Sequence, residues 1–265
     1  MNRILPLFRR ALLDGWRGLL GWTAGIVAVL AIYLPVYSSL AANGQFEDMI
    51  ASLPPELVNT LGYDQIVTGA GYVQATFFGL VGFVIISIAA VGWGTGAIAN
   101  DEETGQLELT LAHGVTRGQL YAERTAAVTV KLAWLGLVAV GMVLALNGPS
   151  DLGIEVGPLF AAAGAFVGLG LLAASASMAV GGISGRRSWS LGAGAAVAVY
   201  GYTMNALGNQ TEDLKWLHGY SPFSWAYGAD PVAHGWDSRI WLVYGVTALL
   251  LLIGWLVFRR RDVAI

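Results

Sequence analysis

Long apolar stretches fill most of this chain and limit the folds that it can adopt. Six of them, each about 18 to 28 residues long, are almost free of charged residues, and a helix rising about 1.5 Å per residue crosses a hydrocarbon layer about 30 Å thick over such lengths. Charged residues make up only 12% of the 265 residues and hydrophobic residues 56%, which lies outside the range of ordinary soluble domains. We therefore predict an all-α polytopic membrane protein.

The expected layout is one transmembrane domain over residues 1–265. Ahead of the first span, basic and apolar side chains of residues 3–17 fall on opposite helix faces, which predicts an amphipathic helix lying along the membrane surface. An acidic loop over residues 41–71 contains a predicted short helix at residues 55–61. We expect the six spans at residues 19–40, 72–99, 125–146, 158–183, 190–207 and 239–258.

The basic residues of the chain predict its orientation. Under the positive-inside rule, loops rich in Lys and Arg face the cytoplasm. With six spans, only Lys215 and Arg239 fall outside, so both termini are expected in the cytoplasm of a prokaryotic cell, whose plasma membrane the chain crosses. The residues placed inside are Arg3, Arg9, Arg10, Arg17, Arg117, Arg124, Arg186, Arg187, Arg259, Arg260 and Arg261.

One basic residue, Lys131, falls within the third predicted span. An ionisable side chain inside a membrane indicates a functional site, but a lysine near the interface can also extend its stem to the lipid headgroups. The sequence leaves both interpretations open.

The polar insert after the second span, residues 100–124, is where such a chain can meet a soluble partner. Its carboxylates surround a short leucine-containing run that cannot cross a membrane. Gly114 is placed to end that run in a left-handed conformation, and Thr116 with Gln119 forms a predicted capping box for the next helix. We expect a helical elbow facing the cytoplasm.

Aromatic residues are dense in the outer segment before the last span. Two interpretations stay open: an aromatic belt at the interface, or short half-helices, broken at Pro222 and Pro231, that dip into the outer leaflet and form a lid. The predicted lid residues are Trp216, Tyr220, Phe223, Trp225 and Tyr227.

Several classes of chemistry find no support in the sequence. There are no cysteines, and no Gly-rich loop ending in Lys-Ser/Thr is present to hold ATP phosphates. Neither catalytic residues nor a metal site is predicted, and no nucleic-acid partner is expected. If ATP drives this protein, another chain must bind it.

The order of interfacial helix, six spans, acidic elbow and aromatic outer segment resembles the permease subunits of type-2 ABC exporters. In the elbow, the acidic pair, the Gly-x-Leu-Glu run, the leucine-rich turn and the Val-Thr-Arg ending are similar to that family. The residues concerned are Glu102, Glu103, Gly105, Leu107, Glu108, Leu109, Leu111, Ala112, Val115 and Arg117.

This resemblance implies a coupling role for the elbow residues. Two cytoplasmic ATPase subunits would bind ATP and Mg²⁺ beneath a dimer of permeases, either two copies or a related pair. The implied function is export of a hydrophobic or amphipathic compound, such as a drug, an antibiotic or a lipid, by a chain surrounded by membrane lipids. The alternative is a membrane anchor or signalling subunit that docks a cytoplasmic partner without transporting anything.

Overall fold

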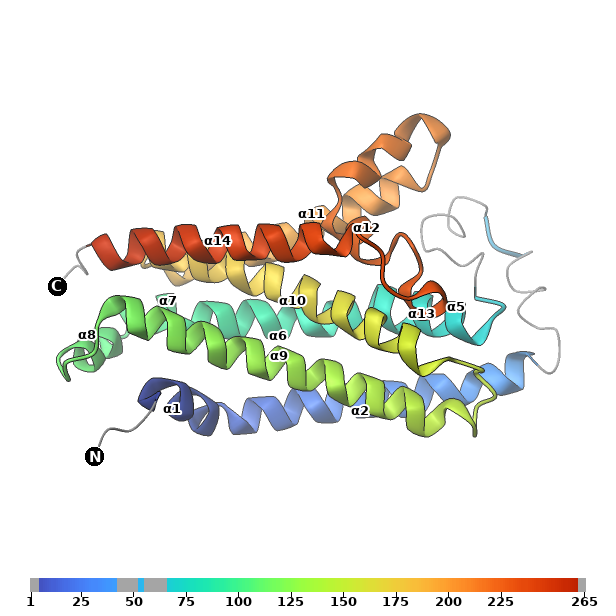
Figure 1. Ribbon diagram of the computed structural model, residues 1–265, viewed down its shortest axis with the longest axis horizontal. Coiled ribbons are helices and arrows are strands. Elements are labelled where there is room, and N and C mark those ends of the chain that lie inside the picture. Colours follow the sequence, from blue (N-terminus) through green and yellow to red (C-terminus); the bar gives the residue numbers. More distant parts are fainter. Residues whose placement is uncertain (1–4, 42–51, 55–65, 262–265) are drawn as a thin grey trace.

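The computed structural model describes residues 5–41, 52–54 and 66–261. Within those ranges every regular element is a helix and no strand occurs, in agreement with the predicted all-α fold. Long helices lie side by side in an elongated bundle (Figure 1). They are α2 (Trp16–Ala41), α6 (Gly82–Ala97), α9 (Arg117–Asn147), α10 (Val156–Ser184), α11 (Arg187–Gly208) and α14 (Ile240–Arg260).

Shorter helices lie at the two ends of the bundle. α1 (Pro6–Asp14), α7 (Ala99–Glu103) and α8 (Gln106–Leu111) lie at the end that also holds both chain termini, called the terminal end below (Figure 1). The opposite, distal end carries α5 (Gly69–Val73), the π-helix η2 (Gln74–Val81), the 3-10 helix η3 (Glu212–Tyr220), α12 (Pro222–Tyr227) and α13 (Pro231–His234).

Helix α10 forms the centre of the bundle. It packs against α6, α9, α11 and α14, and 78% of its most apolar stretch is buried, against 17% for α2 and 22% for α14. Its many Gly, Ala and Ser residues have short side chains, so neighbouring helices can approach closely on every side. The outer helices keep large apolar side chains exposed, as a lipid-facing surface requires.

Five stretches of helix are long and apolar enough to cross a membrane: 16–39, 69–97, 117–147, 156–184 and 240–260. They coincide with five of the six predicted spans. Helix α11 covers the remaining one, residues 190–207, but it is not among the five. Its Ser, Tyr, Asn and Gly residues make it less apolar, so the six-span count stays a prediction.

At the terminal end several helices extend beyond the predicted spans, whereas α6 ends at Ala97, before the predicted end of the second span at residue 99. The amphipathic segment is split, since α1 ends at Asp14, Gly15 follows and α2 begins at Trp16. Helix α9 begins at Arg117, directly after the predicted cap residue Thr116, and so extends ahead of the third predicted span, which starts at residue 125. Sequence hydropathy marks the apolar part of a helix, whereas hydrogen bonding continues into its polar ends. The short helix predicted at residues 55–61 lies outside the described residues.

The second span contains a π-helix that no local sequence pattern predicted. Eight residues, Gln74–Val81, widen the helix between α5 and α6. The adjacent residues Phe77 and Phe78 are both buried there and both pack against Phe166 of α10, with ring centroids 5.8 and 5.7 Å apart. In an α-helix, consecutive side chains point about 100° apart. The wider turn places both rings in the core.

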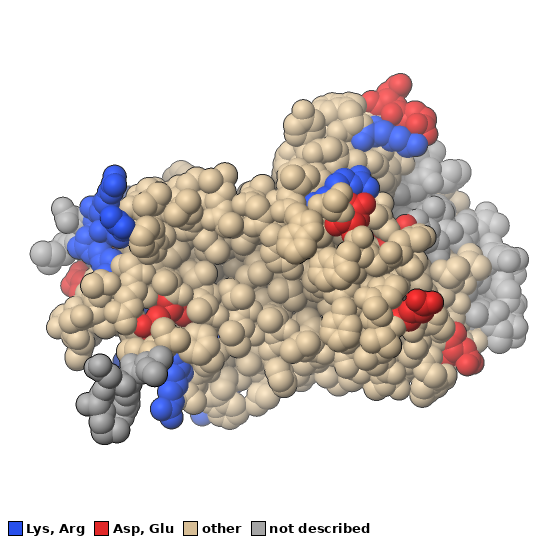
Figure 2. All heavy atoms as spheres, viewed as in Figure 1, with Lys and Arg blue, Asp and Glu red and all other residues tan. Residues whose placement is uncertain are grey.

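Charged residues gather at the two ends of the bundle. On the face shown in Figure 2, Lys, Arg, Asp and Glu lie at the terminal and distal ends, and the long middle of the bundle is free of them. This distribution suits an apolar layer of membrane between two aqueous sides.

Candidate functional site

The insert between α6 and α9 folds into two short helices joined by a sharp turn. Gly105 separates α7 from α8 with φ of 71°, in the left-handed region that glycine adopts without strain. Gly114 follows α8 with φ of 81° and lies at the end of the elbow as predicted. The elbow packs at the terminal end, against the ends of the long helices.

Two carboxylates of α7 bind the beginnings of other helices. Asp101 forms an ion pair with Arg124 of α9, and Arg124 also donates to the Ala97 carbonyl at 2.7 Å. The Glu103 carboxylate accepts the backbone N–H of Arg187 at 2.7 Å, the first residue of α11. A carboxylate is favourable there, because the first N–H groups of a helix lack partners within the helix and carry partial positive charge.

The third carboxylate, Glu102, binds the end of α14. Both of its oxygens accept from the Arg261 guanidinium, which also donates to the Ile183 carbonyl at 3.1 Å. Arg117 of α9 donates in turn to the Arg261 carbonyl. Together, three acidic side chains fasten the elbow to three long helices; we call them the carboxylate clamp, which consists of Asp101, Glu102 and Glu103.

The leucines of α8 divide between the core and the surface. Leu107 is fully buried and Leu111 is half-buried, whereas Leu109 is 66% exposed. Glu108 and Ala112 are exposed on the outer side as well. Of the residues predicted to meet a partner, the outward-facing set is therefore Glu108, Leu109 and Ala112, and the clamp carboxylates are occupied within the chain.

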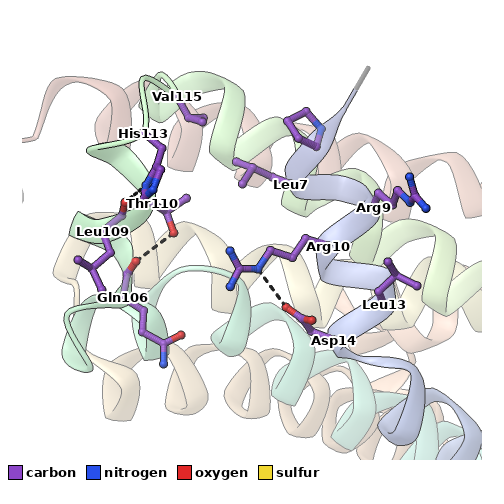
Figure 3. A pocket seen from close by; sticks show the side chains of 11 residues that line it. Leu7, Arg9, Arg10, Leu13, Asp14, Gln106, Leu109, Thr110, His113 and Val115 are labelled. Carbon is purple, nitrogen blue, oxygen red and sulfur yellow. Dashed lines mark hydrogen bonds and ion pairs between the residues drawn. The ribbon is translucent and has the colours of Figure 1, made fainter. Parts of the chain in front are cut away.

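A groove of about 1040 Å³ separates α8 from α1 at the terminal end. Figure 3 shows the side chains of Arg10 and Leu13 on the α1 side and those of Leu109 and His113 on the α8 side. Arg10 forms an exposed ion pair with Asp14 at 3.3 Å (Figure 3). The groove combines apolar side chains with basic groups and lies directly beside the outward face of the elbow.

Glu123 holds α1 in place and was missed by sequence reasoning. It is 3% exposed, and its carboxylate accepts the N–H groups of Leu7 and Phe8, at 2.8 and 2.9 Å. The capping box predicted for α9 forms only in part: Thr116 accepts from the Gln119 backbone at 3.2 Å, but the Gln119 side chain donates to Glu123 at 2.7 Å. The sequence signal that could have identified Glu123 is a single acidic residue near the start of an otherwise apolar helix.

Comparison with known families agrees with this architecture. A family model described as "Multidrug efflux system permease Rv1217c, C-terminal domain" matches residues 14–259. The chain belongs to this family. Comparison with curated proteins gives no match. Together with its long apolar helices, the match supports a membrane protein with a permease role in transport.

In this permease, Lys131 lies in a pocket and not at the protein surface. The residue is only 7% exposed, and its ammonium lies 5.6 Å from the centroid of the Trp93 ring. Gly15, at the junction of α1 and α2, lies directly beside it, since a Cβ built on Gly15 would collide with the ammonium. The ammonium thus lies beside the junction of α1 and α2, and both interpretations of Lys131, a functional charge and an extension toward the headgroups, stay predictions.

The predicted lid residues of the permease fall into two groups. Phe223 and Tyr227 of α12 are buried, and Trp225 is half-buried. Trp216 and Tyr220 of η3 are 61% and 63% exposed. The breaks predicted at the two prolines are present, because α12 begins at Pro222 and α13 at Pro231.

Proposed function

We propose that the chain is the membrane-spanning subunit of an ATP-driven exporter of the type-2 ABC class. The observation that carries the proposal is the carboxylate clamp: a short polar elbow, fixed to the ends of α9, α11 and α14, with its outer face free. An element attached to several long helices at once is suited to transmit a push from a soluble subunit to the whole bundle.

The elbow and its groove have the chemistry of a docking site for a helix of a partner. Leu109 and Ala112 offer apolar contact, while Glu108 and the α1 arginines offer charges of both signs. Amphipathic helices bind in grooves of this mixed kind. In the proposed complex, a cytoplasmic ATPase subunit occupies this site and supplies ATP and Mg²⁺, and closure of two such subunits moves the elbow and α1 together.

The cargo that fits this proposal is hydrophobic or amphipathic. The long middle of the bundle has no charged residue on the face in Figure 2, and a path for ions would normally need carboxylates within the membrane. The family name refers to multidrug efflux, which supports a drug or antibiotic as cargo; a lipid has the same chemistry. We further propose that two permeases, identical or related, enclose the transport path.

The coupling proposal predicts that Glu108→Lys combined with Leu109→Ala weakens the complex with the ATPase. Loss of one partner of a buried, hydrogen-bonded interfacial charge pair typically costs about 2–5 kcal/mol, so if the complex buries Glu108 in such a pair, affinity should fall more than tenfold and export should stop. Co-purification of the permease with a co-expressed ABC ATPase subunit, and ATP hydrolysis stimulated by cargo in the reconstituted complex, measure the two effects.

A matched control exists at the distal end, where an exposed Glu155 precedes an exposed Val156. Glu155→Lys with Val156→Ala should leave the complex intact. Unchanged binding and export in the Glu108, Leu109 double variant would show that the elbow does not dock the ATPase. A stable complex that exports no compound would favour the alternative function, an anchor or signalling subunit.

A further inference from the structure

A second cavity, of about 350 Å³, lies between α1, α6, α9 and the elbow. Its charged lining comprises Arg10, Asp14, Asp101, Arg124 and Lys131. Two of the cations have carboxylate partners, since Arg124 pairs with Asp101 and Arg10 with Asp14. The lining therefore contains one more positive than negative charge, and Lys131 is the cation without an ion-pair partner in that lining.

Lys131 is a buried cation that forms no ion pair within the described part of the chain; the carboxylate that acts on it electrostatically, Asp14, is already paired with Arg10. Among the residues that the structure describes, no carboxylate lies within 4.0 Å of its ammonium, which lies over the face of the Trp93 ring. Removing an ammonium from water is costly unless an opposite charge or hydrogen-bond acceptors compensate. A cation–π contact replaces only part of the lost hydration. An anionic ligand in this pocket would compensate the charge of Lys131 more fully than Trp93 and the Arg10-paired Asp14 do.

The cavity is open toward the outer surface of α6. Gly92 and Gly96 line it, and both have open space where a side chain would lie. One and two helical turns earlier on the same face, Ile88 and Val84 are 56% and 49% exposed. A strip of apolar surface therefore runs along α6 and ends at the cationic pocket.

We propose that this pocket binds the phosphate of an anionic lipid, with the acyl chains along the Val84 and Ile88 surface. The phosphate oxygens would accept from the Lys131 ammonium, and the missing side chains at Gly92 and Gly96 give the headgroup its path inward. A lipid fits better than free phosphate because the apolar strip continues directly from the pocket. Placing the lipid in the cytoplasmic leaflet rests on the proposed orientation, but the binding itself does not depend on an ATPase.

The test uses the purified full chain in an uncharged detergent. Its thermal unfolding midpoint is measured against increasing short-chain phosphatidylglycerol, with short-chain phosphatidylcholine and inorganic phosphate at constant ionic strength as separate arms. A ligand that binds only the folded state raises the midpoint with concentration. We expect phosphatidylglycerol to do so at lower concentration than either comparison ligand.

Lys131→Met should raise the half-saturating concentration of phosphatidylglycerol about tenfold or more, because the phosphate loses a charge-assisted hydrogen bond. Lys131→Arg should retain most of the response. Lys215→Met, which removes an exposed lysine at the distal end, is the matched control and should respond as the unmodified chain does. Native mass spectrometry should show fewer bound phosphatidylglycerol molecules on the Lys131→Met variant than on the unmodified chain, the Lys131→Arg variant or the Lys215→Met variant.

A second pair of variants covers the case in which Lys131→Met does not fold. Gly15→Ala places a methyl group where the ammonium lies, whereas Gly21→Ala meets open space, so only Gly15→Ala should weaken the lipid response. Equal responses to the two lipids, or equal lipid responses in the Lys131→Met and Lys215→Met variants, would overturn the proposal. If inorganic phosphate alone saturates the response, and Lys131→Met abolishes that response, the ligand is free phosphate and the lipid proposal is overturned.

Discussion

Single residues at the terminal end connect elements that are far apart in the sequence. Glu123 is the clearest case, because its buried carboxylate receives two backbone N–H groups from the first turn of α1. Pro6 precedes those groups at the first position of the helix, where its missing N–H costs nothing. The amphipathic helix is thus held by a hydrogen-bonded anchor as well as by its apolar face.

Replacement of Glu123 by Ala should destabilise the protein and release α1. Two amides would lose their acceptor in a buried position, at a cost of about 2–3 kcal/mol. The thermal unfolding midpoint in detergent should fall, and limited proteolysis should cleave before Trp16 sooner than in the unmodified chain. Glu212→Ala removes a carboxylate whose side chain is 83% exposed and should change neither readout; equal losses in both variants would refute the anchor role.

At the scale of elements, the outer segment shows how similar aromatic residues take different roles. Phe223 packs edge-on against Phe83 and Tyr227, with centroids 5.1 Å apart in each pair, and joins α12 to α6. Helix η3 packs instead on the end of α11, and the two project from the bundle as the orange segment in Figure 1. Trp216 and Tyr220 lie exposed on that projection, so the lid hypothesis now concerns η3 above all.

Trp216→Ala combined with Tyr220→Ala should change which compounds are exported, or how fast, without changing stability. Both rings are exposed and contribute little to the core, whereas a water-excluding lid needs large amphipathic rings. Transport per folded complex across a panel of compounds, together with the unfolding midpoint, tests this. By contrast, Phe223→Ala should cost about 3–5 kcal/mol of stability. An unchanged transport profile in the double variant would favour the interfacial belt.

Glycine pairs four residues apart also differ in whether a neighbouring side chain packs on them. Gly164 and Gly168 are tightly covered by Trp236 and Tyr244, as close packing of α10 requires, but Gly21 and Gly25, at the same spacing, meet open space. On α6, a Cβ at Gly94 would lie 2.7 Å from the Ala174 carbonyl oxygen of α10. Glycine spacing indicates where close approach is possible, and the neighbouring helix decides where it occurs.

For the whole molecule, the arrangement of the long helices decides the topology. Both ends of the described chain lie at the terminal end (Figure 1), and α11 packs along α10 and α6 between the elbow and η3. If α11 crosses the membrane with the other five, loops alternate sides, and the elbow is cytoplasmic while residues 148–155 and η3 are external.

Single cysteines test this directly, because the chain has none of its own. Asp151, Asp213 and His113 are exposed. In intact cells, a membrane-impermeant maleimide should label Asp151→Cys and Asp213→Cys, and should label His113→Cys only after permeabilisation. If Asp151→Cys reacts from outside but Asp213→Cys does not, α11 fails to cross and the six-span prediction is wrong.

The sequence alone determined the features that depend on neighbouring residues. Helix class follows from long apolar runs, the starts of α12 and α13 from proline, and the end of the elbow from a left-handed Gly114. These outcomes depend on backbone sterics and on hydrogen bonds a few residues apart. The sequence also placed the charges at the ends of the helices.

Only the tertiary structure decided which partner each charge received. Glu102 meets Arg261 across 159 positions and Glu123 meets Leu7 across 116, and neither spacing is visible in a local pattern. The predicted coupling carboxylates are largely used within the chain, and Lys131 is enclosed in a pocket. The physical reason is that an ion pair or a buried charge depends on which helices are neighbours, and packing of the whole bundle sets that.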